Sequence, residues 1–225
     1  MQRHCMETNW AAEHLQIIRT LMERSALYRR ALAPIMIFAG LIGIGAAVAG
    51  AVLGIKTQTE FTGYWMSVAL AGVAGAFLLV RRQALKNNEP FWSPPARRVA
   101  QALLPPLTAG LLLGVLVFIV WSRPAVVTPP NDMRDDAGDL LWLPALWAVF
   151  YGCALHAAGF FTLRGLRLFG WLFIAAGNLI LLFLFIPREF PELAWQNSHY
   201  LMGFLFGFLQ LAYGVYLYVT EKRDL

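Results

Sequence analysis

The chain has 225 residues, of which 59% are hydrophobic and 14% are charged, and its formal net charge at pH 7 is +5. Soluble domains of this length are much less apolar, and the apolar residues here occur in long blocks, so the composition predicts an integral membrane protein. The basic residues lie beside the ends of these blocks without interleaved aromatic residues. This pattern argues against nucleic-acid binding and favours anionic lipid headgroups as the counter-charge.

The first 32 residues are polar and contain no short apolar core of the kind that a cleaved signal peptide carries. Leu15, Ile18 and Met22 recur at helical spacing, and charged residues fill the other side. We therefore expect segment 1–32 to form an amphipathic cytoplasmic helix. Such a helix lies on the membrane surface or docks to a cytoplasmic partner.

Six apolar blocks follow, and each is close to the roughly 20 residues that a helix needs to cross a bilayer. The predicted spans are 33–54, 61–80, 104–121, 140–163, 168–186 and 200–219. Arg164 and Arg167 mark the turn between the fourth and fifth spans. The expected fold is all-α: a polytopic transmembrane six-helix bundle over 33–225, preceded by the N-terminal amphipathic helix.

The loop 81–103 separates the second span from the third. Ser93 followed by Pro94 is typical of a helix start, so a short helix should lead into the third span. Most lysine and arginine residues fall on the side of this loop, which places both termini in the cytoplasm. The expected lipid-headgroup anchors are Arg29, Arg30, Arg81, Arg82, Arg97, Arg98 and Trp92.

Two stretches, HLQIIRTLMERSALYRRALAPIM and EPFWSPPARRVAQALLPPL, together cover most of the cytoplasmic half of the chain. They resemble a family of small bacterial multi-pass membrane proteins to which no activity is assigned. The resemblance implies a bacterial origin and therefore the inner membrane. It implies no catalytic residue, cofactor or partner.

Small residues at helical spacing predict the faces on which the spans pack, because membrane helices associate through close contact of small side chains. The predicted packing residues are Ala46, Gly50, Gly54, Gly110, Gly114, Gly203 and Gly207. A homo-oligomer or a membrane partner subunit would use the same kind of face.

Polar residues inside the spans are the candidates for a site. His156 lies in line with Ala148 and Gly152 at spacings of four, so it should face a neighbouring helix. The predicted intramembrane polar cluster comprises His156, Asn178, Gln210 and Tyr213. These residues either hydrogen-bond the helices together or line a small cavity.

No other pattern indicates chemistry. The spans contain no Asp or Glu, and no known catalytic or metal-binding motif occurs. Met36 lies at a depth compatible with His156 as a haem ligand, but methionine in an apolar helix usually serves packing, so we expect no metal and no cofactor. His199 is expected in an outer rim with Glu189, Glu192 and Trp195.

Two functional hypotheses follow. The first is a non-catalytic membrane protein, such as a sensor, scaffold or accessory subunit, which contacts its partner through the cytoplasmic segments. The alternative is a small-solute or lipid transporter with a polar cavity among spans four to six. An enzyme is not expected, because no catalytic motif is present.

Overall fold

The computed structural model describes residues 32–86, 94–123, 141–162, 164–185 and 194–223. Every regular element in these ranges is a helix. They are Leu32–Leu53 (the first helix), α2 (Gln58–Lys86), α3 (Pro94–Trp121), α4 (Trp142–Ala158), α5 (Arg164–Phe185), α6 (Ala194–Met202), η2 (Gly203–Phe208) and α7 (Leu209–Arg223). The elements α6, η2 and α7 are continuous and are called the last helix below. The expected N-terminal helix, Arg29, Arg30 and Trp92 lie outside the described residues.

Within the described ranges, five helices are long and apolar enough to cross a membrane, which agrees with a membrane-integral protein. They are the first helix, α2, α3, α5 and the last helix, and each contains most of a predicted span. The fourth predicted span, 140–163, corresponds to the shorter helix α4, which has 17 residues. Its last turn gives way to turns and bends at Gly159 to Thr162, just before the arginine-flanked connection to α5.

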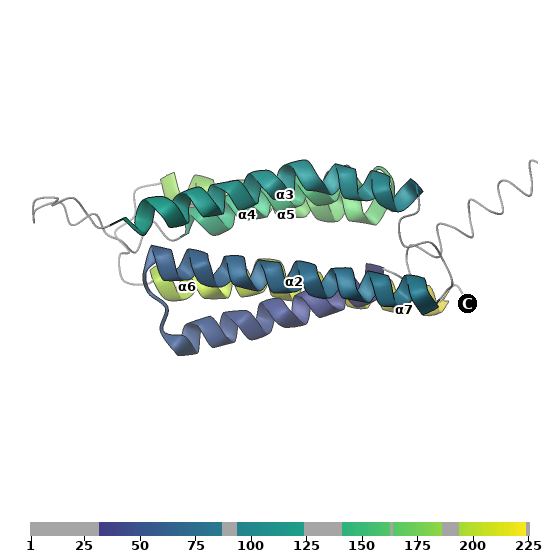
Figure 1. Cartoon of the computed structure of the whole chain (residues 1–225), viewed down its shortest axis with the longest axis horizontal. Coiled ribbons are helices and arrows are strands. Elements are labelled where there is room, and N and C mark those ends of the chain that lie inside the picture. Colours follow the sequence, from purple (N-terminus) through teal and green to yellow (C-terminus); the bar gives the residue numbers. More distant parts are fainter. Residues whose placement is uncertain (1–31, 87–93, 124–140, 163, 186–193, 224–225) are drawn as a thin grey trace, which may run out of the picture.

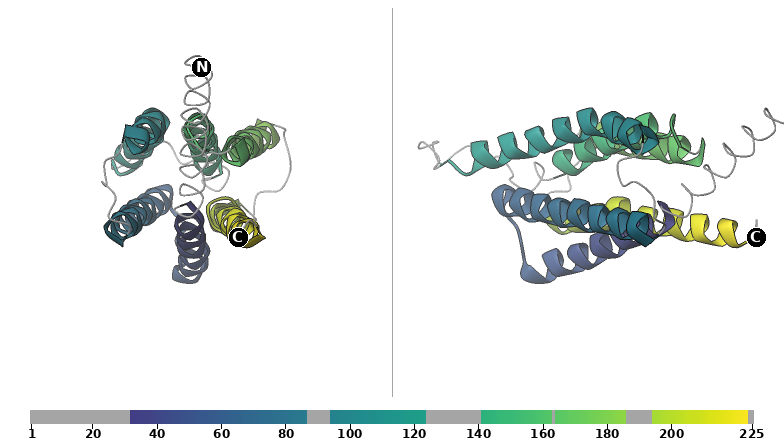
Figure 2. Two further views of the ribbon diagram at one scale, coloured as in Figure 1. Left: turned by 90° about the vertical axis from the view of Figure 1, so that its right-hand side faces the viewer. Right: turned by 45° about the vertical axis from the view of Figure 1, so that its right-hand side comes forward.

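The helices are arranged in two layers (Figure 1). One layer contains α3, α4 and α5, and the other contains α2, the first helix and the last helix, with α4 and the first helix in the central positions (Figure 2). Consecutive helices run in opposite directions. The end of α2, the α4–α5 connection and the end of α7 therefore lie at one end of the bundle.

Glycines bring the neighbouring helices within each layer into backbone contact. A Cβ atom on Gly152 of α4 would lie 2.7 Å from the carbonyl oxygen of Gly170 on α5. A Cβ atom on Gly207 of the last helix would lie 2.7 Å from the backbone nitrogen of Ile44 on the first helix. Close approach of this kind increases dispersion contact between helices in lipid, where the hydrophobic effect does not drive helix association.

Aromatic side chains join the two layers. Phe173 of α5 is fully buried and lies 5.7 Å, between ring centroids, from Phe206 of the last helix. Tyr151 of α4 packs edge-on against both rings, at 5.1 Å and 5.4 Å. Tilted and edge-to-face arrangements at these distances are the favoured ones for aromatic pairs. The centre of the bundle is thus a packed aromatic core.

Helix α3 differs in one respect from the prediction. A helix does begin at Pro94, but it is not a separate short helix, since it continues through Pro105 and Pro106 to Trp121 as one helix of 28 residues. Prolines inside a helix remove backbone donors, yet membrane helices tolerate them when nearby groups adjust. Here the Thr108 hydroxyl donates to the carbonyl oxygens of Leu104 and Pro105, at 2.8 Å and 2.9 Å.

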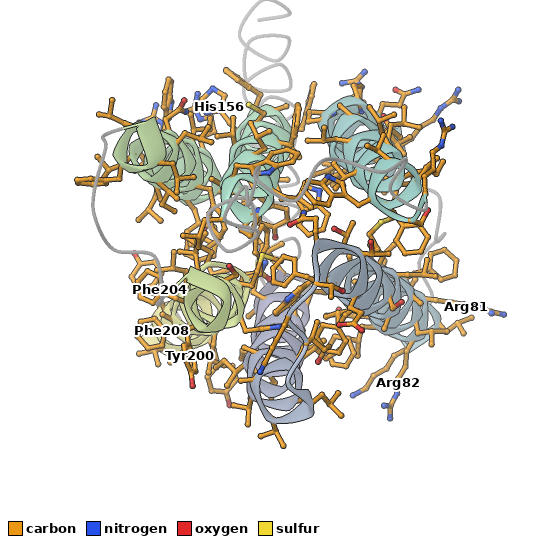
Figure 3. The ribbon with its side chains drawn as sticks, turned by 90° about the vertical axis from the view of Figure 1, so that its left-hand side faces the viewer. Arg81, Arg82, His156, Tyr200, Phe204 and Phe208 are labelled. Atoms are coloured by element: carbon orange, nitrogen blue, oxygen red, sulfur yellow. The ribbon has the colours of Figure 1, made fainter. Side chains whose placement is uncertain are left out.

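The last helix contains a π-helical segment, η2, at its centre. The backbone N–H of Leu209 donates to the carbonyl oxygen of Phe204, five residues earlier. Phe204 and Phe208 point outward together with Tyr200 (Figure 3). Segments of this type insert one extra residue into a helix and often occur near functional sites.

Candidate functional site

His199 lies near the start of the last helix and is fully buried. The indole N–H of Trp65, on α2, is 3.3 Å from Nδ1 of His199, and Nε2 of His199 is 3.3 Å from the carbonyl oxygen of Ile55. Because Nδ1 accepts the indole proton, Nε2 must carry the ring proton and donate it to Ile55. Both nitrogens of a neutral imidazole are therefore satisfied within the protein.

Aromatic rings and a glycine enclose this imidazole. Phe61 and Tyr64 of α2 pack edge-on against it, with ring centroids at 5.1 Å and 6.0 Å. A Cβ atom on Gly50 of the first helix would lie 2.5 Å from its Nδ1 atom, so only glycine fits there. The hydroxyl of Tyr64 also donates to the carbonyl oxygen of Ala46, at 2.6 Å. His199 and its neighbours thus tie together the first helix, α2 and the last helix.

The prediction of an exposed outer rim is wrong for His199, which is buried, and the other predicted members of the rim, Glu189, Glu192 and the Trp195 side chain, lie outside the described residues. His199 precedes Gly203 by four residues and Gly207 by eight, so all three share the face that packs on the first helix. That spacing was present in the sequence and indicated burial. No pattern in the sequence pointed to Trp65 as the hydrogen-bond partner, because the two residues are 134 positions apart.

Two more buried polar residues lie one turn away on α2. The Thr62 hydroxyl donates to the carbonyl oxygen of Gln58 at 2.7 Å, and the Gln58 amide nitrogen lies 3.4 Å from the same hydroxyl. The Gln58 side-chain oxygen is buried without a hydrogen-bond partner. Among the described residues no group of three or more His, Cys, Asp or Glu side chains could hold a metal ion. This end of the bundle offers hydrogen bonds and aromatic contacts.

The predicted polar cluster is only partly assembled. Gln210 is buried and donates through Nε2 to the hydroxyl of Tyr151 on α4, at 3.0 Å, while its Oε1 atom is buried without a hydrogen-bond partner. Tyr213, one turn further along, stacks on Phe169 of α5 at 4.4 Å between ring centroids. The structure therefore places Gln210 and Tyr213 against the other layer, and it adds Tyr151, which sequence reasoning missed.

Asn178 and His156 lie elsewhere. Asn178 is exposed and donates to the carbonyl oxygen of Ile174 in its own helix, at 2.8 Å. Its neighbour Gly177 is buried against α4, and one residue along a helix turns the side chain by about 100°. His156 is half-buried, and its ring lies between Phe160 and Trp171 on the outer side of the α3–α4–α5 layer (Figure 3).

The predicted packing residues occupy different environments. Gly203 and Gly207 face Ala47 and Ile44 of the first helix. A Cβ atom on Gly114 would lie 3.0 Å from the Trp147 ring. Gly110 makes looser contacts with Trp147 and Phe150, and its carbonyl oxygen accepts the Trp147 indole N–H at 3.0 Å.

Gly54 is an exception among them, since no heavy atom lies within 4 Å of where its Cβ would be. Its φ of 66° instead ends the first helix in the left-handed region that glycine adopts readily.

The predicted headgroup anchors within the described residues are all exposed. Arg81 and Arg82 lie near the end of α2, and Arg97 and Arg98 lie in the first turns of α3. These positions are at the same end of the bundle as the C-terminal end of α7. Positive charge therefore gathers at one end of the apolar helices, where headgroups would lie.

No protein-family model, curated protein or solved structure matches this chain. The resemblance to a bacterial membrane-protein family therefore stays a prediction. The geometry of the bundle is the basis for the functional proposal.

Proposed function

We propose that this chain is a non-catalytic subunit of a membrane complex, a scaffold, sensor or accessory protein of the bacterial inner membrane. It spans the membrane six times, with α4 as the fourth span, and both termini are cytoplasmic. The 17 residues of α4 extend about 25 Å, close to the roughly 30 Å of a hydrocarbon core. The orientation follows from the arginines at the end of α2 and the start of α3, which lie at the end of the bundle where α7 ends.

The contrast between the two sides of the first helix carries the proposal. On one side, Gly40, Gly43 and Gly50 meet the last helix at backbone or ring distance. On the other side, Gly45 and Ala49 are exposed, and no heavy atom lies within 4 Å of where a Cβ atom on Gly45 would be. The first helix therefore has a second small-residue face that no described residue covers.

This exposed face, defined here as Leu41, Gly45, Val48, Ala49 and Val52, combines two small residues with three exposed aliphatic ones. The exposed side of α3 instead carries large aliphatic residues, among them Leu111, Leu112 and Leu116. Leucines suit contact with acyl chains, whereas glycine and alanine let another helix approach closely. The exposed face of the first helix therefore suits a transmembrane helix of a partner subunit.

The use of the buried polar groups also supports a non-catalytic role. The His199 ring, the Tyr64 hydroxyl and the Trp147 indole each hydrogen-bond another helix or its connecting turn. Bonds of this kind hold membrane helices in register. Contacts between helices therefore account for these polar side chains without a catalytic step.

The test is the size of the complex extracted from native membranes in mild detergent. Gly45→Leu with Ala49→Leu adds bulk to the exposed face of the first helix. Ala71→Leu with Ala74→Leu adds comparable bulk at exposed positions of α2 and serves as the matched control. We expect the wild type and the α2 variant to migrate with a partner, and the first-helix variant to migrate as the 25.1 kDa chain alone.

Two outcomes would contradict the proposal. If the wild type carries no partner, or if both variants lose it equally, the first helix has no special role. A complex that contains only copies of this chain would replace the accessory subunit with a homo-oligomer.

A small-solute transporter is the second candidate, and the unpartnered Oε1 atom of Gln210 favours it. This oxygen is buried in the middle of the last helix, beside Tyr151 and two residues beyond the π-helical segment. A permeating solute with a donor group would satisfy it. Under this alternative Gln210→Leu abolishes uptake of the solute, whereas the first-helix substitutions leave it unchanged.

A further inference from the structure

The connection between α4 and α5 brings together two arginines, a histidine and several exposed aromatic side chains. Arg164 begins α5, and Arg167 follows one turn later with its guanidinium carbon 5.1 Å from the centre of the Phe160 ring. His156, near the end of α4, contacts the same Phe160 ring edge-on, at 5.1 Å between centroids. Trp171 closes the group on the α5 side, at 5.4 Å from the imidazole.

No carboxylate among the described residues neutralises the positive charges here. Within the described side chains, Arg164 and Arg167 form no ion pair with a carboxylate, and the interaction that Arg167 makes is with the Phe160 ring. A guanidinium held over an aromatic face keeps its donors directed outward. The arginine pair therefore forms a cationic site with free donors.

The imidazole of His156 also has unused hydrogen-bonding capacity. Its Nδ1 atom is buried without a hydrogen-bond partner, and its aromatic contacts are those with the Phe160 and Trp171 rings. At least one nitrogen of an imidazole always carries a proton. With the proton on Nε2, which is not buried, the N–H has no acceptor among the described residues, and a phosphate oxygen would supply one.

The surface below the arginines is apolar. Leu168 and Trp171 follow Arg164 at spacings of four and seven along α5, so the three share one outward face of that helix. Leu168 is 71% exposed, Trp171 is 55% exposed and Phe160 is 63% exposed. Along this face, positive charge at the end of the bundle gives way to apolar side chains toward its middle.

The lack of a side chain at Gly159 allows Arg167 to reach the Phe160 ring. Gly159 is buried, and a Cβ atom there would collide with the side chain of Arg167 and lie 2.8 Å from its backbone nitrogen. The Arg167 side chain can therefore cross close over the end of α4 only because residue 159 has no side chain. That crossing places the guanidinium over Phe160.

We propose that the α4–α5 connection binds one anionic phospholipid, with its phosphate on Arg164, Arg167 and the His156 N–H, and its acyl chains along Leu168 and Trp171. The charge calls for an anion, and basic pockets at the ends of membrane helices bind phosphate headgroups. The adjoining apolar face selects a lipid over free phosphate, because a small ion would leave Leu168 and Trp171 uncovered. This inference does not depend on the proposed function.

The experiment uses the full chain in mild detergent and native mass spectrometry, with phosphatidylglycerol or phosphatidylcholine added at increasing concentration. The test variant is Arg164→Gln with Arg167→Gln, and Arg164→Gln alone, at an exposed position, is the second variant if the pair fails to fold. The matched control is Arg81→Gln with Arg82→Gln, which removes the same charge at the same end of the bundle. Figure 3 shows Arg81 and Arg82 on the side of the bundle opposite His156.

We expect one phosphatidylglycerol to bind each wild-type chain more tightly than phosphatidylcholine. The test variant should lose about tenfold or more in affinity, since each cation near an anionic headgroup contributes roughly a fivefold factor. The control should lose less than about threefold. His156→Phe, which keeps the ring contacts but removes the N–H, should weaken phosphatidylglycerol binding and leave phosphatidylcholine unchanged.

Three results would overturn the proposal. Equal losses in the test and control variants would show a general attraction of the charged surface. Equal binding of the two lipids to the wild type would remove the requirement for an anion. Displacement of phosphatidylglycerol by millimolar inorganic phosphate would identify the site as one for free phosphate.

Discussion

The hydrogen bond between Trp65 and His199 can be tested by a double-mutant cycle, because each partner can be replaced by phenylalanine, which keeps an aromatic ring but cannot make the bond. Phenylalanine at 199 keeps an aromatic ring in the enclosure formed by Phe61, Tyr64 and Gly50 but removes both ring nitrogens. Phenylalanine at 65 keeps a ring but removes the indole N–H that lies 3.3 Å from His199 Nδ1.

The size of the effect follows from burial and from the surroundings. His199→Phe leaves the indole N–H and the Ile55 carbonyl oxygen without their partner, and one unsatisfied buried group costs about 1–3 kcal/mol. Hydrogen bonds between membrane helices average only about 0.6 kcal/mol and reach about 1.7 kcal/mol. We therefore expect His199→Phe to destabilise the protein by about 1–3 kcal/mol. The destabilisation of the double variant should be smaller than the sum for Trp65→Phe and His199→Phe, by about 0.6–1.7 kcal/mol.

The assay is reversible unfolding in bicelles by titration with sodium dodecyl sulfate, followed by circular dichroism. Tyr151→Phe combined with His199→Phe is the control, because the Tyr151 partner Gln210 is eleven residues beyond His199, about 16 Å along the helix. Those two changes should add. If Trp65→Phe and His199→Phe also add within error, the two side chains do not interact and the assigned tautomer is wrong.

Two further predictions concern packing. Gly207→Ala should destabilise the protein by about 1–3 kcal/mol in the same assay, because the added Cβ would meet the backbone of the first helix. Gly72→Ala, where a Cβ would have open space, should be neutral or slightly stabilising. Equal effects would refute the close contact between Gly207 and the first helix. Tyr151→Phe should cost about 1–3 kcal/mol, since it leaves both ends of the buried Gln210 amide unpaired, and adding Gln210→Leu to it should recover stability. A double variant less stable than Tyr151→Phe alone would contradict this explanation of the amide.

The helical architecture was predictable because the signal comes from long apolar blocks. Any helix that crosses lipid needs a continuous apolar stretch, and its basic flanks mark where it ends. The start at Pro94 was predictable for a local reason as well, since proline fits the first turn of a helix. The unbroken junction between this helix and the third span, near Pro105 and Pro106, was not predicted, because proline normally interrupts helices in water.

The polar site was harder to predict, because it depends on which helices become neighbours. Spacing placed Gln210 on the small-residue face of its helix, and the structure buries it. Spacing could not identify Tyr151 as its partner, since that pairing depends on the contact between the two layers. Asn178 shows the limit of reasoning from adjacent residues, because it adjoins the buried Gly177 and is itself exposed.

His199 shows the opposite error, because it was predicted to be exposed and is buried. Its position near the end of a predicted span suggested an aqueous rim, although its spacing from Gly203 and Gly207 matched the packed face. Burial became possible because Gly50 provides the space and Trp65 with Ile55 provides the hydrogen bonds. These three contributions come from the first helix, the turn after it and α2, which the spacing within one helix cannot reveal.

The proposed function depends above all on contact between the exposed face of the first helix and a partner subunit. Photo-crosslinking in the native membrane detects that contact, with a photoreactive amino acid placed at Gly45 and, as a control, at the exposed Leu112 of α3. We expect a discrete crosslinked protein band from position 45 and only lipid adducts from position 112. Lipid adducts alone from both positions would contradict the proposed function.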